Sequence, residues 1–123
     1  MNDDDARAFA AAWVDAWNRR DLDAILAHYA ADVELTSPLA ARSDGMLRGT
    51  AELRDYLDVE FHSCPDLHLE VHHTLAGVDG VTIVCSRENG AVIAEVMILD
   101  AARRIRRAWA FYHHPVRPDM PPD

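Results

Sequence analysis

The sequence contains no lysine and no glutamine, and all 12 of its basic residues are arginine. Without lysine, the chain can neither form a Schiff base with a carbonyl substrate nor use a lysine side chain as a base. A Walker-type phosphate loop also requires its lysine, so nucleotide sites of that family are excluded. Acid and base chemistry is therefore left to carboxylates, histidines and tyrosines.

Cysteine and long apolar runs are equally scarce. Cys64 and Cys85 are the only cysteines, too few for the disulfide scaffold of a small secreted protein. No apolar run reaches the roughly 18 residues of a membrane span. The opening residues Met1–Asp5 are acidic where a signal peptide would be basic. We therefore expect a cytoplasmic protein with no membrane partner, whose cysteines are buried or half-buried thiols.

Positive charge is outnumbered by 21 acidic residues, which gives a formal net charge of −9 at pH 7. Binding to nucleic acid rests on many phosphate contacts from basic groups, so no nucleic-acid partner is expected. The 123 residues suit a single domain over 1–123. Its ordered core should span about 6–112, because the segment 113–123 is rich in proline and predicts an irregular tail.

The front half of the chain predicts three helices. Residues 6–20 have one aromatic face at helical spacing, formed by Phe9, Trp13 and Trp17. Asp21 is a suitable N-cap for a short second helix. Thr50 is the expected cap of a third helix that runs to about His62.

The period then changes from helical to alternating, which predicts strands. One short strand is expected among the helices at Val33–Thr36, followed by a loop over residues 39–49. Four more strands are expected at 67–75, 81–87, 91–99 and 104–112. Helices segregated from an antiparallel meander make an α+β domain. A curved sheet with helices across its mouth would enclose a pocket.

The chain resembles the nuclear transport factor 2-like superfamily, most closely its SnoaL-like branch. The resemblance lies in the order and spacing of four segments: Trp17–Ile25, His28–Glu34, Ser37-Pro38 and Arg48-Gly49-Thr50. It implies a cone-shaped α+β barrel in which three N-terminal helices pack on a strongly curved, mainly antiparallel sheet around an apolar pocket. It also implies a homodimer formed through the outer sheet face.

Members of this superfamily include ketosteroid isomerase, polyketide cyclases, dehydratases, epoxide hydrolases and non-catalytic binding domains, so the fold does not settle function. Ketosteroid isomerase pairs an aspartate base with an oxyanion hole of tyrosine and protonated aspartate. By alignment, Ser37 takes the position of that base and Trp13 the position of that tyrosine. A lone serine is a poor proton acceptor and an indole cannot accept a hydrogen bond, so steroid isomerisation by that mechanism is disfavoured.

The third position, the protonated acid, falls on Glu95. It lies in Val92–Leu99, the most apolar stretch of the chain. Burial there would raise the pKa of the carboxyl, which suits a general acid or base. Alternatively, Glu95 faces outward or pairs with an arginine of a neighbouring strand, such as Arg106.

An inward Glu95 defines a candidate ligand pocket. Alternation would carry Met97 inward with Glu95, and on the last strand Arg106, Ala108, Ala110 and Tyr112 would face the cavity. The candidate pocket residues are Trp13, Trp17, Ser37, His73, Met97 and Tyr112. For the tryptophans and Tyr112, ordinary core packing is the more common role of such residues, and it is compatible with lining a pocket. His73 shares the apolar parity of its strand, as a core histidine or as a proton carrier paired with Glu95.

No metal site or other cofactor is expected. His68, Glu70 and His72 share one strand face, but neighbours on such a face lie roughly 7 Å apart and do not converge on one ion. The basic run Arg103–Arg107 is divided between strand faces by alternation, which favours a solvated turn over a phosphate clamp.

Two function classes remain. In the first, the protein is a cofactor-free isomerase, cyclase or hydrolase in which Glu95 transfers a proton to or from an apolar, oxygenated small molecule. In the second, the same fold is a non-catalytic ligand-binding or dimeric adaptor domain. In that case Glu95 orients a ligand or serves as a structural partner.

Overall fold

The computed structural model describes residues 1–38, 40 and 45–113, so most of the proline-rich tail expected at 113–123 lies outside the described residues. The helices are α1 (Asp3–Asn18), α2 (Leu22–Leu26) and α3 (Gly49–Ser63). The strands are β1 (Tyr29–Thr36), β2 (Met46–Arg48), β3 (Leu69–Ala76), β4 (Gly80–Arg87), β5 (Val92–Leu99) and β6 (Ile105–His113). Among these helices, none is long and apolar enough to cross a membrane.

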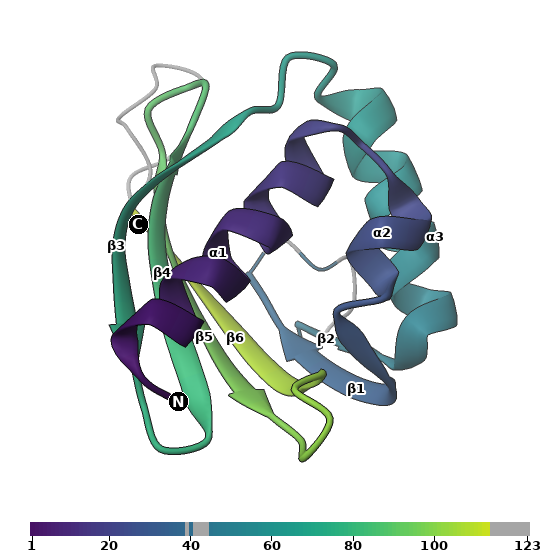
Figure 1. The fold of residues 1–123 in the computed structure, drawn as a ribbon. Coiled ribbons are helices and arrows are strands. Elements are labelled where there is room, and N and C mark those ends of the chain that lie inside the picture. Colours follow the sequence, from purple (N-terminus) through teal and green to yellow (C-terminus); the bar gives the residue numbers. More distant parts are fainter. Residues whose placement is uncertain (39, 41–44, 114–123) are drawn as a thin grey trace.

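The six strands form one mixed sheet in the order β2-β1-β6-β5-β4-β3. All neighbouring strands are antiparallel except β1 and β6, which run parallel. The sheet bends around α1, and α2 and α3 cover it on the side of β1 and β2 (Figure 1). The sheet does not close on itself. This is the cone-shaped α+β fold that the sequence predicts.

The first two helices begin at side-chain caps. Asn2 caps α1 by accepting from the backbone N–H of Asp5 at 2.7 Å. Asp21 caps α2, as predicted, by accepting from the N–H of Ala24 at 3.1 Å.

The segment before α3 differs from the expected loop. Met46–Arg48 form the short strand β2, which pairs with the end of β1. The prediction of Thr50 as the cap of α3 is wrong, because the helix already begins at Gly49 and its N-cap residue is Arg48, whose side chain does not cap the helix. Instead, Glu52 accepts from the backbone N–H of Arg48 at 2.9 Å and satisfies one free donor of the first turn.

A β-bulge in β3 changes which side chains face the core. Val71 pairs with Cys85, but His73 pairs with Val84, so one extra residue lies in β3 between them. An inserted residue exchanges the two faces of a strand beyond it. The prediction that His73 lies on the buried face is therefore wrong: it is exposed.

A second bulge lies in β6. Ile98 pairs with Arg107 and Leu99 pairs with Ile105, which leaves Arg106 as the extra residue. Arg106 is exposed, so the prediction that it turns toward the cavity is wrong. Beyond the bulge the predicted alternation holds. Ala108 and Ala110 are buried, and Phe111 faces outward with 60% of its surface exposed.

The core lies between the helices and the inner face of the sheet. α1 contributes residues one helical turn apart: Ala6, Ala10, Trp13 and Ala16. The sheet contributes alternate residues of its central strands, including Ile83, Cys85, Ile93, Met97, Ala108 and Ala110. The carboxyl group of Glu95 shares this apolar face.

Candidate functional site

Glu95 lies at the centre of the sheet, on the face that the helices cover. Its strand neighbours of the same parity, Ile93 and Met97, are both buried. Across the strands it lies opposite Ile83 of β4 and Ala110 of β6, which are also buried. Because strand side chains alternate, the carboxyl group points into the interior of the cone.

The Glu95 carboxyl is surrounded by protein, and this burial alone raises its pKa from the ordinary value of 4.5 to about 7. The residue nevertheless keeps intermediate exposure. Among the described residues, no hydrogen bond or ion pair holds Glu95, and Arg106, its expected alternative partner, is exposed.

Three phenols and one thiol lie close enough to Glu95 to interact with it electrostatically. They belong to Tyr29 of β1, Tyr56 of α3, Cys85 of β4 and Tyr112 of β6. Burial raises the pKa of all four, and the Glu95 charge raises it further. The pKa of Cys85 reaches about 12, and the phenols stay protonated across the physiological range. Glu95 is therefore the proton-exchanging group of this cluster near neutral pH.

The indoles of α1 form the apolar wall next to Tyr29. Trp13 is fully buried, and its Nε1 donates to the Tyr29 hydroxyl at 3.1 Å. Trp17 is half-buried and packs between Trp13 and Phe61, with ring centroids 5.4 and 5.8 Å away. The Trp17 Nε1 is buried and has no hydrogen-bond partner among the residues that the structure describes. Both tryptophans belong to the core and also border the Glu95 cluster.

Ser37 and Met97 complete the set of residues that the sequence places near the site. Ser37 is only 3% exposed, and its backbone N–H donates to the carbonyl of Gly45 at 2.8 Å. Its hydroxyl hydrogen-bonds Tyr56, which opposes the rise in the pKa of that phenol. Met97 is buried on the face of Glu95.

Sequence reasoning missed an ion-pair cluster at the edge of this face. Arg87 ends β4 with a side chain only 8% exposed; its Nη1 lies 3.1 Å from Glu60 of α3, and its Nε lies 3.5 Å from Glu88. Burial lowers the pKa of Arg87, but the nearby Cys64 and the two carboxylates raise it by more. The signal available in the sequence is parity, because Arg87 shares the strand face of the buried residues Ile83 and Cys85.

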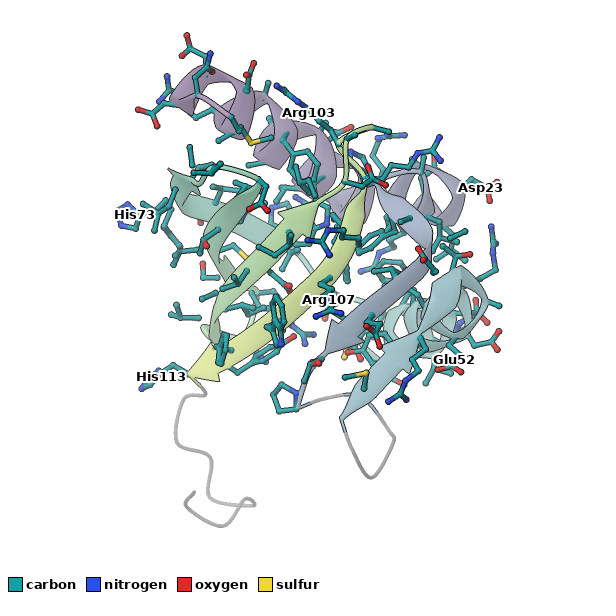
Figure 2. All side chains as sticks on the ribbon, turned by 90° about the horizontal axis from the view of Figure 1, so that it is seen from below. Asp23, Glu52, His73, Arg103, Arg107 and His113 are labelled. Carbon is teal, nitrogen blue, oxygen red and sulfur yellow. The ribbon has the colours of Figure 1, made fainter. Side chains whose placement is uncertain are left out.

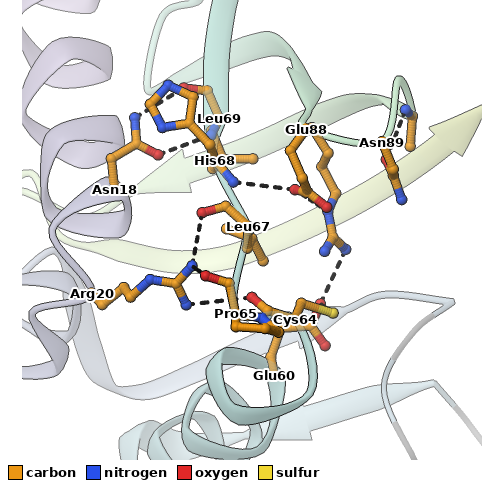
Figure 3. Close-up of polar contacts among 12 residues, drawn as sticks. Asn18, Arg20, Glu60, Cys64, Pro65, Leu67, His68, Leu69, Glu88 and Asn89 are labelled. Carbon is orange, nitrogen blue, oxygen red and sulfur yellow. Dashed lines mark hydrogen bonds and ion pairs between the residues drawn. The ribbon is translucent and has the colours of Figure 1, made fainter.

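A polar clamp holds the end of α3 next to that cluster (Figure 3). The Asn18 side chain donates to the carbonyl of Leu69 at 2.9 Å and accepts from its N–H at 2.8 Å. The Arg20 guanidinium donates to the carbonyl of Phe61 in the last turn of α3 and to three carbonyls of the α3–β3 connection, those of Cys64, Pro65 and Leu67. These contacts fix the segment that carries Glu60 and Cys64.

His73 is not part of this site. Figure 2 shows its side chain pointing away from the sheet into solvent. The neighbouring His72 is also exposed, and its Nε2 lies 2.7 Å from the Ser86 hydroxyl. Within the described part of the chain, no group of three or more His, Cys, Asp or Glu side chains could hold a metal ion.

Comparison with known proteins relates this geometry to a family. A sequence profile of the SnoaL-like domain matches residues 10–114. The chain is similar to a SnoaL-like protein of unknown function from Burkholderia thailandensis E264, whose crystal structure is known. The two are 39% identical, the match covers 93% of this chain and 99% of that one, and the TM-score is 0.88. Among the curated proteins, no sequence matches.

More distant solved structures share the fold. One is a proposed ketosteroid isomerase from Kribbella flavida DSM 17836, at 20% identity, with 96% of this chain and 83% of that one covered and a TM-score of 0.73. Another is AclR, a proposed hydroxylase from Streptomyces galilaeus, at 20% identity, with 91% of each chain covered and a TM-score of 0.71. At this level of identity, the likeness concerns the fold alone.

Proposed function

Since the chain belongs to the SnoaL-like family, we propose that it binds an apolar, oxygenated small molecule inside the cone and transfers a proton through Glu95. The reaction class is a cofactor-free isomerisation, cyclisation or hydrolysis. Trp13, Trp17 and Met97 supply the apolar surroundings of the ligand, and the tyrosines and Ser37 supply hydrogen bonds.

One observation carries the proposal: Glu95 lies on the inner face of the sheet, its carboxyl is unpaired among the described residues, and the residue keeps intermediate exposure. An ionised carboxylate in such a place is costly unless it is paired, so its pKa rises to about 7 instead. General acid–base catalysis is most efficient when the pKa of the group is near the working pH. A structural glutamate would be expected to have a cation or backbone donors beside it.

The chemical step uses both forms of the carboxyl. The neutral acid donates its proton to an oxygen of the ligand, and the ionised carboxylate accepts a proton from a carbon or hydroxyl of the ligand. Near pH 7 both forms are populated, so either step can come first. Tyr56 and Tyr112 are half-buried and stay protonated, so they can donate hydrogen bonds to a ligand oxygen on which negative charge develops.

Proton transfer can be tested without the natural substrate. We would incubate the protein with the ketone 2-acetonaphthone in D2O and follow deuterium incorporation beside the carbonyl by NMR. We expect the wild-type protein to accelerate this exchange and Glu95→Gln to lower the acceleration by about a hundredfold. Glu70→Gln, on the exposed side of β3, is the matched control and should exchange at the wild-type rate. Exchange by Glu95→Gln at the wild-type rate would contradict the role of Glu95.

A second candidate, non-catalytic binding, is favoured by one observation. Ser37 occupies the position of the ketosteroid isomerase base, and it is buried and bonded to Tyr56, where it is a poor proton acceptor. If the wild-type protein binds the ketone, as followed by quenching of tryptophan fluorescence, but does not accelerate exchange, the binding function is the correct one.

A further inference from the structure

The charges around the site are unevenly distributed. Glu95 carries none in its protonated form, and the phenols of Tyr29, Tyr56 and Tyr112 are neutral. The charged groups nearby are Arg87 and its two carboxylate partners, Glu60 and Glu88. One guanidinium and two carboxylates leave this cluster with a net charge of −1.

Arg87 faces the same interior as Glu95. On β4 it has the parity of Ile83 and Cys85, and Ile83 lies directly opposite Glu95. Its positive charge lowers the pKa of Tyr56 and of Tyr112, which Glu95 also influences. Arg87 is thus the cation that an anionic ligand in the cone would approach.

That cation is already neutralised. Glu60 holds its Nη1 at 3.1 Å, Glu88 lies 3.5 Å from its Nε, and its side chain is almost completely buried. A ligand carboxylate or phosphate would lose its hydration inside the cone and would find Arg87 paired with two carboxylates. Both the lost hydration and the like charges oppose binding in an interior of low dielectric. An uncharged carbonyl or hydroxyl has a far smaller desolvation cost.

We propose that the Glu60–Arg87–Glu88 cluster selects ligands by charge, so that the cone admits uncharged oxygenated molecules and rejects carboxylates and phosphates of the same size. The inference rests on the proposed function, because it assumes that the ligand binds beside Glu95. Glu60 is the deciding residue: it approaches Arg87 most closely and reaches the site from α3, outside the sheet.

Two probes of matched shape test the selection: 2-acetonaphthone, a neutral ketone, and 2-naphthoate, its carboxylate counterpart. Affinities would be measured by calorimetry at about pH 6, where Glu95 is mostly protonated and the naphthoate is ionised. We expect the wild-type protein to bind the ketone at least about tenfold more tightly, since like charges in contact are costly. Glu60→Gln should tighten naphthoate binding about tenfold and leave ketone binding unchanged.

The control is Asp55→Asn, which removes the same charge from an exposed position of α3. It should keep the wild-type preference for the ketone. Circular dichroism would verify that Glu60→Gln is folded, and Glu88→Gln, which removes the other carboxylate, provides the same test if it is not.

The outcomes separate the two proposals. Equal binding of both probes by the wild-type protein, or a Glu60→Gln protein that weakens both equally, would overturn selection by charge and leave the proposed function standing. Failure of both probes to bind the wild-type protein or the variants would overturn the proposed function and the selection together.

Discussion

At the scale of the residue, Glu95 links the chemistry of the site to the stability of the fold. In the unfolded chain this carboxyl releases its proton near its ordinary pKa of 4.5, whereas in the folded protein it releases it near 7. Between these values the folded state holds more protons than the unfolded state. The free energy of unfolding therefore falls as the pH rises through this window, and above pH 7 the loss is complete.

We predict that Glu95→Gln removes this loss, because the amide has the shape of the neutral acid and does not titrate. Relative to wild type, its free energy of unfolding should rise by about 2 to 3 kcal/mol between about pH 4.5 and pH 8. Urea denaturation of both proteins at each pH measures the difference. Glu70→Gln is the exposed control. If the difference in the free energy of unfolding between Glu95→Gln and wild type did not change with pH, Glu95 would have an ordinary pKa.

At the scale of the element, the clamp formed by Asn18 and Arg20 gives a structural role to residues 17–25, one of the segments on which the family resemblance rests. Residues 17–25 join α1 to α2, and their side chains also fix the connection from α3 to β3. The amide of Asn18 bonds both backbone groups of Leu69, as a neighbouring strand would. The clamp thereby ties the first helix to the beginning of the four-strand meander.

We predict that Asn18→Ala lowers the free energy of unfolding by about 1 to 3 kcal/mol, because it leaves the N–H and the carbonyl of Leu69 without partners. Asn18→Asp keeps the acceptor and loses the donor, so its loss should be smaller. Chemical denaturation followed by circular dichroism measures both. A wild-type stability for Asn18→Ala would show that water replaces the clamp at no cost.

Most helices and strands could be predicted from the sequence, because caps and hydrophobic periodicity are local patterns. Asp21 predicts the start of α2, and the change from helical to alternating period predicts the four-strand meander. Bulges depend on the neighbouring strand, so alternation alone could not place them. The extra residues at His72 and Arg106 each exchange the faces of a strand, so strict alternation places His73 and Arg106 on the wrong side.

The candidate site was also predictable only in part: the sequence indicates its central acid but not the residues around it. An acidic residue within an apolar strand can be recognised in the sequence alone, so Glu95 is predictable as a candidate. Its surroundings come from four separate strands and α3, and no local pattern joins Tyr29, Tyr56 and Tyr112 to it. The pairing of Arg87 with Glu60 spans a helix and a strand, and it became apparent only in three dimensions.

At the scale of the whole molecule, several apolar side chains are exposed on the outer face of the sheet. Phe111, Leu75 and Val92 are each at least 40% exposed on this face. Exposed apolar patches of this kind mark surfaces for association. We propose that two copies of the chain pair through this face, which would leave both cones open on the opposite side.

We predict that Phe111→Glu converts such a dimer to a monomer, because each copy would bring a charge into the apolar interface. Sedimentation equilibrium measures the mass of the assembly. Val59→Glu, which changes an equally exposed apolar residue on α3, should stay dimeric. A monomeric wild-type protein, or equal dissociation of both variants, would contradict pairing through the sheet.

The parallel pairing of β1 with β6 governs the order in which the protein can be assembled during translation. Tyr29 lies beside Ile105, so these partners are separated by roughly three fifths of the chain. On the ribosome, β1 can find β2 early, but its other edge stays open until β6 has emerged. Until then, this edge of β1 presents unpaired backbone groups, and nascent chains are at greatest risk of joining one another in this interval.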